Sequence, residues 1–141
     1  MIYQPETLDK YRKEAKELYY NVLNSYYAAD IMRLVDVCNG VGGQGSKLNP
    51  ILNFAYRRYQ SCAAPHDWAY YIGGTDADKH MADVAFKSNM LIRWKELYGA
   101  FRYVNPVALW DRNLIRLAYI AVDTGGYSYF NYHTGTKPSC S

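Results

Sequence analysis

Two adjacent glycines, Gly73 and Gly74, divide the middle of the chain into two runs of apolar residues with helical spacing. Glycine ends helices because it adopts backbone conformations that other residues avoid. Residues that can cap a new helix follow at once, and apolar side chains then recur at steps of three and four residues up to Tyr98. So short a connection turns the second helix back along the first. The sequence therefore predicts an antiparallel helical hairpin with its turn near residue 74.

Helical patterns also account for most of the remaining sequence, with glycine, asparagine or proline between them. Residues 127–132 alternate too briefly to distinguish a short strand from an aromatic lid. A chain of 141 residues, half of them hydrophobic, is long enough for one core and too short for two. We therefore expect a single all-α domain over residues 1–141. The expected helices span residues 7–24, 51–60, 61–72, 76–98 and 107–122, with a further apolar stretch at 26–37.

Charge and hydropathy exclude several classes of function. The net charge is only +3, and no run of Lys or Arg is typical of a nucleic-acid-binding tail, so nucleic acid is not an expected partner. No stretch reaches the roughly 20 apolar residues that a membrane-spanning helix requires, and the first residues do not form a signal peptide. The 16 tyrosines indicate either a Tyr-rich core or a surface that faces lipid or a partner.

The cysteines indicate the redox setting of the protein. Cys38, Cys62 and Cys140 cannot all pair within one chain, and they are too sparse for the disulfide framework of a small secreted domain. The expected location is therefore cytoplasmic, or in a virion or an effector that leaves the cell without a signal peptide. A single bridge between Cys62 and Cys140 remains an open alternative, because a residue in the tail can reach many places.

The hairpin places three polar residues where they can cooperate. His66 and Asp83 lie at nearly equal distances from the turn, so they are level with each other on facing helices. A carboxylate that holds one imidazole nitrogen fixes the tautomer and leaves the other nitrogen free to take a proton from water. Tyr70 follows His66 by four residues, shares its helix face and can hold Asp83 through its hydroxyl group. These residues form a candidate general-base site.

Asp67 and a glycine-rich segment suggest a metal site beside this pair. Asp67 points about 100° away from His66 around the helix and can face residues 38–50, which contain four closely spaced glycines. Calcium prefers six to eight oxygen ligands, including carboxylates and backbone carbonyls, so one carboxylate and such a loop suit this ion. Zinc is the weaker alternative, because the cysteines and histidines have no spacing typical of a zinc site.

Each of these features also has a purely structural explanation. A His-Asp dipeptide arises by chance, Asp83 can be a solvated helix residue, and glycine loops usually only turn the chain. The order of the features along the sequence, with compatible geometry, favours a shared function. His80 and His133 receive no functional role.

In this order, the motifs resemble those of the phospholipase A2 superfamily. Its members carry a glycine-rich calcium loop of the form C-G-x-G-G-x-G, a helix with C-C-x-x-H-D-x-C-Y and a later helix with C-D-x-x-F. The corresponding segments here are residues 39–45, 62–70 and 82–86. The resemblance extends from residue 38 to about residue 90, within a motif core of residues 38–98. It implies a small all-α domain with two long antiparallel catalytic helices, a calcium loop and flanking amphipathic helices.

The resemblance also implies an activity, the calcium-dependent hydrolysis of the sn-2 acyl ester of phospholipids at a membrane surface. His66 would be the base for a water molecule, and Asp83, supported by Tyr70, would orient it. The backbone N–H of Gly40 would help to bind the oxyanion. The implied calcium ligands are the carboxylate of Asp67 and the backbone carbonyls of Cys38, Gly40 and Gly42. The candidate acyl-chain residues are Leu34, Phe54, Trp68 and Tyr71.

The chain departs from the family pattern at its cysteines. Alanine stands at residues 69 and 82, where the family clamps its two catalytic helices with a disulfide, and Asn39 and Ala63 replace a second pair. In this respect the chain is similar to the cysteine-poor phospholipase domains of parvovirus capsids and to prokaryotic phospholipases A2. Two alternatives remain: a non-catalytic module that binds lipid or a partner on the same scaffold, and an esterase for a non-phospholipid ester.

Overall fold

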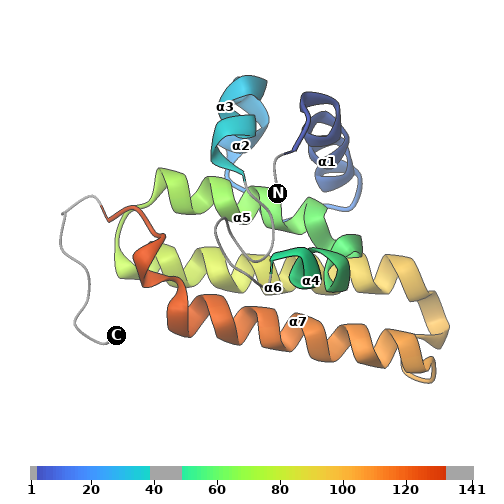
Figure 1. The fold of residues 1–141 in the computed structure, drawn as a ribbon. Coiled ribbons are helices and arrows are strands. Elements are labelled where there is room, and N and C mark those ends of the chain that lie inside the picture. Colours follow the sequence, from blue (N-terminus) through green and yellow to red (C-terminus); the bar gives the residue numbers. More distant parts are fainter. Residues whose placement is uncertain (1–2, 39–48, 133–141) are drawn as a thin grey trace.

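A computed structural model of the chain describes residues 3–38 and 49–132. Within these ranges the regular secondary structure is entirely helical and no strand forms, which confirms the all-α prediction (Figure 1). In the same part of the chain, no helix combines the length and apolar character needed to cross a bilayer. The helices are α1 (Pro5–Glu17), α2 (Asn24–Ala28), α3 (Ile31–Val37), α4 (Asn49–Ala55), α5 (Gln60–Ile72), α6 (Asp76–Tyr98) and α7 (Pro106–Gly125), with 3-10 turns η1 (Arg57–Tyr59), η2 (Gly99–Phe101) and η3 (Gly126–Ser128).

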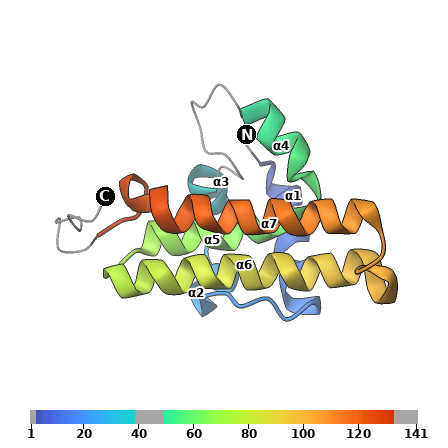
Figure 2. The same ribbon diagram turned by 90° about the horizontal axis from the view of Figure 1, so that it is seen from below.

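Three long helices form the body of the molecule. Figures 1 and 2 show α6 running alongside both α5 and α7, and its contacts with these two helices are the most extensive in the structure. The N-terminal helices α1 and α3 pack on α5 from its other side. The core therefore lies on both sides of α5, and α5 is the most deeply buried of the long helices.

The predicted hairpin is present and turns at the double glycine. Gly73 and Gly74 both have positive φ angles, 73° and 137°. A Cβ atom on Gly73 would lie 1.8 Å from the carbonyl oxygen of Asn131, so the turn requires glycine for space as well as for conformation. Thr75 and Asp78 then form a capping box at the start of α6, as the sequence predicts for this position.

The first helix is shorter than its apolar spacing predicts. α1 ends at Glu17, Tyr19 adopts a positive φ of 58°, and the chain then runs along α6. Asn21 donates its backbone N–H to Oδ1 of the buried Asn89 at 2.7 Å, and Nδ2 of Asn89 returns a bond to the Asn21 carbonyl at 3.0 Å. The prediction of one helix to residue 24 was wrong because this partner lies 68 residues away in sequence.

A buried carboxylate connects α7 to two other elements. Asp111 accepts hydrogen bonds from the hydroxyl groups of Tyr59 and Tyr98, at 2.8 and 2.7 Å, and lies 3.6 Å from the guanidinium group of Arg58. These contacts tie the start of α7 to η1 and to the end of α6. Residues 51–60 accordingly form α4 and η1 around this junction instead of the single helix that their pattern predicts.

The C-terminal part of the described chain folds over the hairpin turn. In this segment, residues 126–132, which we call the strap, Asn131 donates to the Tyr70 carbonyl at 3.1 Å and accepts from the Gly74 N–H at 3.0 Å. The rings of Phe130 and Tyr132 are buried. The strap makes one isolated bridge to Gly74 but no regular strand, so it is an aromatic cover for the turn.

Cys38 and Cys62 are free thiols in the core. Burial raises the pKa of Cys62 to about 12, so this thiol stays protonated at neutral pH. Cys140 lies outside the described residues. The two hairpin positions occupied by alanine, residues 69 and 82, contain no sulfur to join, and the strap supplies a non-covalent clamp at the same end of the hairpin.

Candidate active site

The hairpin brings His66 and Asp83 together as their distances from the turn predict. Nε2 of His66, on α5, lies 2.9 Å from Oδ1 of Asp83, on α6. The Asp83 side chain is fully buried and that of His66 is nearly so. The imidazole ring also stacks on Phe86, with centroids 4.5 Å apart and planes at 24°. The orientation of the imidazole is therefore fixed from two sides.

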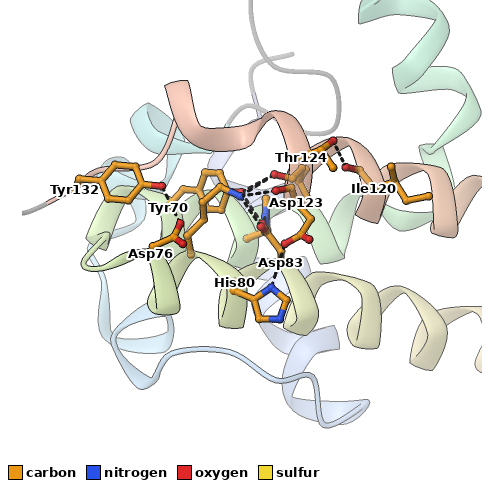
Figure 3. Close-up of polar contacts among 11 residues, drawn as sticks. Tyr70, Asp76, His80, Asp83, Ile120, Asp123, Thr124 and Tyr132 are labelled. Carbon is orange, nitrogen blue, oxygen red and sulfur yellow. Dashed lines mark hydrogen bonds and ion pairs between the residues drawn. The ribbon is translucent and has the colours of Figure 1, made fainter. Parts of the chain in front are cut away.

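Tyr70 supports the carboxylate from α5. Its hydroxyl group donates to Oδ1 of Asp83 at 2.5 Å, and its ring lies 4.3 Å from that of His66. Figure 3 shows the Tyr70 and Asp83 side chains meeting beside the last turn of α7, which carries Asp123. Phe130 of the strap packs edge-on against the Tyr70 ring. The predicted contact between Tyr70 and Asp83 is thus present, and Phe130 additionally packs against the Tyr70 ring.

Sequence reasoning missed a third residue that binds the carboxylate. Nζ of Lys79 donates to Oδ2 of Asp83 at 2.8 Å, and only 2% of the Lys79 side chain is exposed. The spacing of four residues was a visible signal, because side chains four apart in a helix are neighbours. What the sequence did not reveal is that this pair is buried instead of solvated.

The surroundings set the ionisation of the pair. Burial alone would raise the pKa of Asp83, but the hydrogen bonds from His66, Lys79 and Tyr70 outweigh it and hold the pKa below its usual value. For His66, burial lowers the pKa, and the nearby charge of Lys79 lowers it further against the opposing effect of Asp83. At neutral pH the site therefore contains a carboxylate and an uncharged imidazole.

These ionisation states determine the tautomer of His66. An ionised carboxylate can only accept hydrogen bonds, so Nε2 carries the proton that faces Asp83. Nδ1 then holds a lone pair and can accept a proton. A neutral, oriented imidazole of this kind can act as a general base toward water.

The imidazole lies at the wall of a pocket between α5, α6 and the segment that follows α1. The pocket has a volume of about 450 Å³ and is mostly apolar. Its wall includes Val22, Leu23, Pro65, Ala69, Ile72, Met81, Ala82, Ala85 and Phe86. None of the four acyl-chain candidates from the sequence (Leu34, Phe54, Trp68 and Tyr71) lines this pocket. The sequence could not reveal this, because it does not show which way a side chain outside the hairpin interface faces. Small alanines at the hairpin interface, which the sequence does show, make the space.

Asp67 follows His66 on α5 but does not line the pocket. It is half-buried. Burial raises the pKa of the Cys38 thiol, and the neighbouring charge of Asp67 raises it further. Asp67 thus acts electrostatically on Cys38, the residue that follows α3, although the predicted calcium ligand of Cys38 is its backbone carbonyl and not its thiol. Gly40 and Gly42 lie outside the described residues.

His80, one of the two histidines to which the sequence analysis gave no functional role, has a structural contact. Nδ1 of His80 lies 3.1 Å from Oδ1 of Asp123, on the surface between α6 and α7 (Figure 3). Its side chain is 60% exposed, unlike that of His66. His133 lies outside the described residues.

Comparisons of the chain with protein-family profiles, curated proteins and solved structures find no match. The functional inference therefore depends on the chemistry of the site and on the motifs of the sequence. That chemistry is a buried Asp-His pair with a proton-accepting nitrogen, beside an apolar pocket.

Proposed function

We propose that the protein is a calcium-dependent hydrolase that cleaves the sn-2 acyl ester of phospholipids, with His66 as the general base. The observation that carries the proposal is the buried His66–Asp83 pair at the wall of an apolar pocket. A pocket of this kind suits an acyl chain, and an oriented neutral imidazole suits the activation of water. The resemblance of the motifs supplies the substrate class.

The reaction follows from the roles of the three residues. Nδ1 of His66 takes a proton from water as the oxygen attacks the ester carbonyl, and the imidazolium that forms is stabilised by Asp83. Tyr70 keeps the carboxylate in place. When the tetrahedral intermediate collapses, His66 returns the proton to the departing alcohol oxygen. The products are a fatty acid and a lysophospholipid, and no covalent enzyme intermediate forms.

The region around Asp67 fits calcium in its type of donor. Asp67 offers a half-buried carboxylate whose charge acts on Cys38, the first residue of the glycine-rich segment. No group of three or more His, Cys, Asp or Glu side chains that could hold a metal occurs among residues 3–38 and 49–132. The resemblance implies that the remaining ligands would be the backbone carbonyls of Cys38, Gly40 and Gly42. When bound, calcium would stabilise negative charge on the oxyanion and on the substrate phosphate.

The decisive test is the release of fatty acid from phospholipid vesicles. We expect the wild type to be active with calcium and inactive with a chelator, and His66→Ala to lose activity by roughly 100-fold or more. His80→Ala is the matched control, because His80 is exposed and lies outside the pair. Activity in His66→Ala equal to that of the control would exclude His66 as the base, and calcium-independent turnover would exclude the metal.

Asp67→Asn tests the position of the metal. We expect this variant to lose calcium stimulation and nearly all turnover, because Asp67 is the carboxylate adjacent to the base. Asp36→Asn, an exposed change on α3, should behave as the wild type. Calcium-stimulated turnover that survives in Asp67→Asn would show that the ion binds elsewhere.

A second candidate is an esterase for substrates without a phosphate group. It is favoured by the composition of the pocket, whose lining among the described residues contains no Lys or Arg and does not include Asp67. A panel that compares phosphatidylcholine with a monoacylglycerol of the same acyl chain separates the two candidates. Preference for the monoacylglycerol, abolished by His66→Ala, would replace the phospholipid in the proposal and keep the base.

A further inference from the structure

The ammonium group of Lys79 is held by two helices and an aromatic ring. Besides its bond to Asp83, Nζ donates to the backbone carbonyls of Val122 at 2.9 Å and Asp123 at 3.3 Å, in the last turns of α7. The ring of Tyr127 in the strap lies 4.4 Å from the same nitrogen. Lys79 thus connects the carboxylate of the pair to a helix that carries neither His66 nor Asp83.

Stability alone does not account for a charge in this position. Burying an ammonium group is unfavourable, and a buried ion pair is often no more stable than well-packed apolar side chains of the same volume. The carbonyls at the end of α7 favour a cation, since the C-terminus of a helix carries partial negative charge. They explain why the lysine is tolerated there, but they do not decide which oxygen of the Asp83 carboxylate it bonds.

The two oxygens of Asp83 have different partners, and this difference suggests what the lysine does. Oδ1 accepts from His66 and Tyr70, which both lie on α5, while Oδ2 accepts from Lys79. Bonds to Oδ1 alone would leave the carboxylate able to rotate about the bond to its Cβ atom. A third bond, to the other oxygen, fixes its plane.

We propose that Lys79 is a positioning residue for the hydrolysis, which anchors Oδ2 of Asp83 to the end of α7 and so keeps Oδ1 directed at His66. This inference rests on the proposed function. It adds α7 to the elements on which the geometry of the general base depends.

The first test is kinetic. Lys79→Met removes the ammonium group and keeps an unbranched chain of similar length, and we expect kcat to fall roughly 10- to 100-fold with KM nearly unchanged. Lys79→Arg, which keeps a cationic donor, should recover part of the loss. Lys95→Met, an exposed change on the same helix, should retain the wild-type kcat. Equal kcat in Lys79→Met and Lys95→Met would overturn the proposal.

The second test asks whether Lys79 acts through Asp83. In the Asp83→Asn background the carboxylate is absent, so Lys79→Met should change kcat less than about threefold, because linked residues are not additive. A further tenfold loss in this double variant would show that Lys79 acts by another route and would overturn the proposal. This comparison does not use Lys79→Met in the wild-type background, where the buried Asp83 carboxylate would lose its cationic partner.

A spectroscopic measurement separates this inference from the proposed function. The proton on Nε2 of His66 gives a downfield imidazole resonance while its hydrogen bond to Asp83 is held. We expect Lys79→Met to broaden or shift that resonance and Lys95→Met to leave it unchanged. An unshifted resonance in Lys79→Met would contradict the positioning role even if lipid is hydrolysed. If the wild type hydrolyses no lipid, the proposed function fails while the resonance still decides the role of Lys79.

Discussion

His66 is a buried histidine whose protonation couples the stability of the fold to pH. Burial holds its pKa below the ordinary value of 6.5, so the ring is neutral at pH 7. The unfolded chain exposes the same ring to water, where its pKa returns to about 6.5. Between these two pKa values the unfolded state binds more protons than the folded state.

This difference predicts how pH affects stability and activity. Because protons favour the unfolded chain, the free energy of unfolding should be level above pH 6.5 and fall as pH decreases below it. Urea unfolding at several pH values measures this slope, and the acidic limb of kcat/KM should have an apparent pKa below 6.5, since only neutral His66 acts as a base.

The variant His66→Gln assigns that slope. It should flatten the slope between pH 6.5 and about pH 4, below which carboxyl groups of the unfolded chain take up protons. A slope that survives in His66→Gln would belong to another group and would contradict the assignment.

Sequence reasoning succeeded at residues whose partners are near in sequence. His66, Tyr70 and Asp83 belong to one hairpin, so their contacts follow from helical geometry and the position of the turn. The bonds of Asn89 to Asn21 and of Asp111 to Tyr59 were not predictable, because they join elements 68 and 52 residues apart. Only the packing of whole helices decides such pairs.

At the scale of elements, the end of α7 lies beside Tyr70, whose hydroxyl group bonds Asp83. A Cβ atom on Gly126 would lie 2.5 Å from the hydroxyl oxygen of Tyr70, whereas a Cβ atom on Gly125 would meet nothing within 4 Å. Tyr70 cannot move aside freely, since its hydroxyl group bonds Asp83 and its ring packs on Phe130. The end of α7 therefore requires a residue without a side chain at one position and tolerates one at the position before it.

These neighbouring glycines provide a matched pair of variants. Gly126→Ala should lower the free energy of unfolding by about 1–3 kcal/mol and reduce kcat, because it pushes Tyr70 away from Asp83. Gly125→Ala should be neutral or stabilising by up to about 1 kcal/mol, since alanine is the better helix former. Thermal unfolding and vesicle hydrolysis measure both effects. Equal behaviour of the two variants would mean that the Tyr70 contact does not constrain the site.

Element boundaries show where local signals suffice. α6 begins with a capping box and ends at glycine, so both limits could be predicted from its own residues. α1 has a good amphipathic pattern but ends at Glu17, because the following segment is hydrogen-bonded to Asn89 of α6. The extent of α6 was thus a local property, and that of α1 depended on the assembled fold.

At the scale of the whole molecule, the site is built from distant parts of the chain. α5 carries His66 and α6 carries Asp83, while α7 carbonyls bond Lys79 and the strap packs against Tyr70. The motifs that indicated a function lie on α5, on α6 and in the glycine-rich segment of residues 38–50. The supporting layer has no motif, since it consists of backbone carbonyls, one glycine and packed rings.

The position of the strap in the sequence sets the order in which the site can form during synthesis. The ribosome releases the chain from its N-terminus, so His66 and Asp83 are made well before residues 122–132, which carry the groups that bond Lys79 and pack on Tyr70. A growing chain that contains His66 and Asp83 but not residues 122–132 still lacks the contacts that hold Lys79 and Tyr70. A lipid hydrolase of this design would become competent only after residues 122–132 had been synthesised and had packed, which would protect nearby membranes from copies that lack this segment.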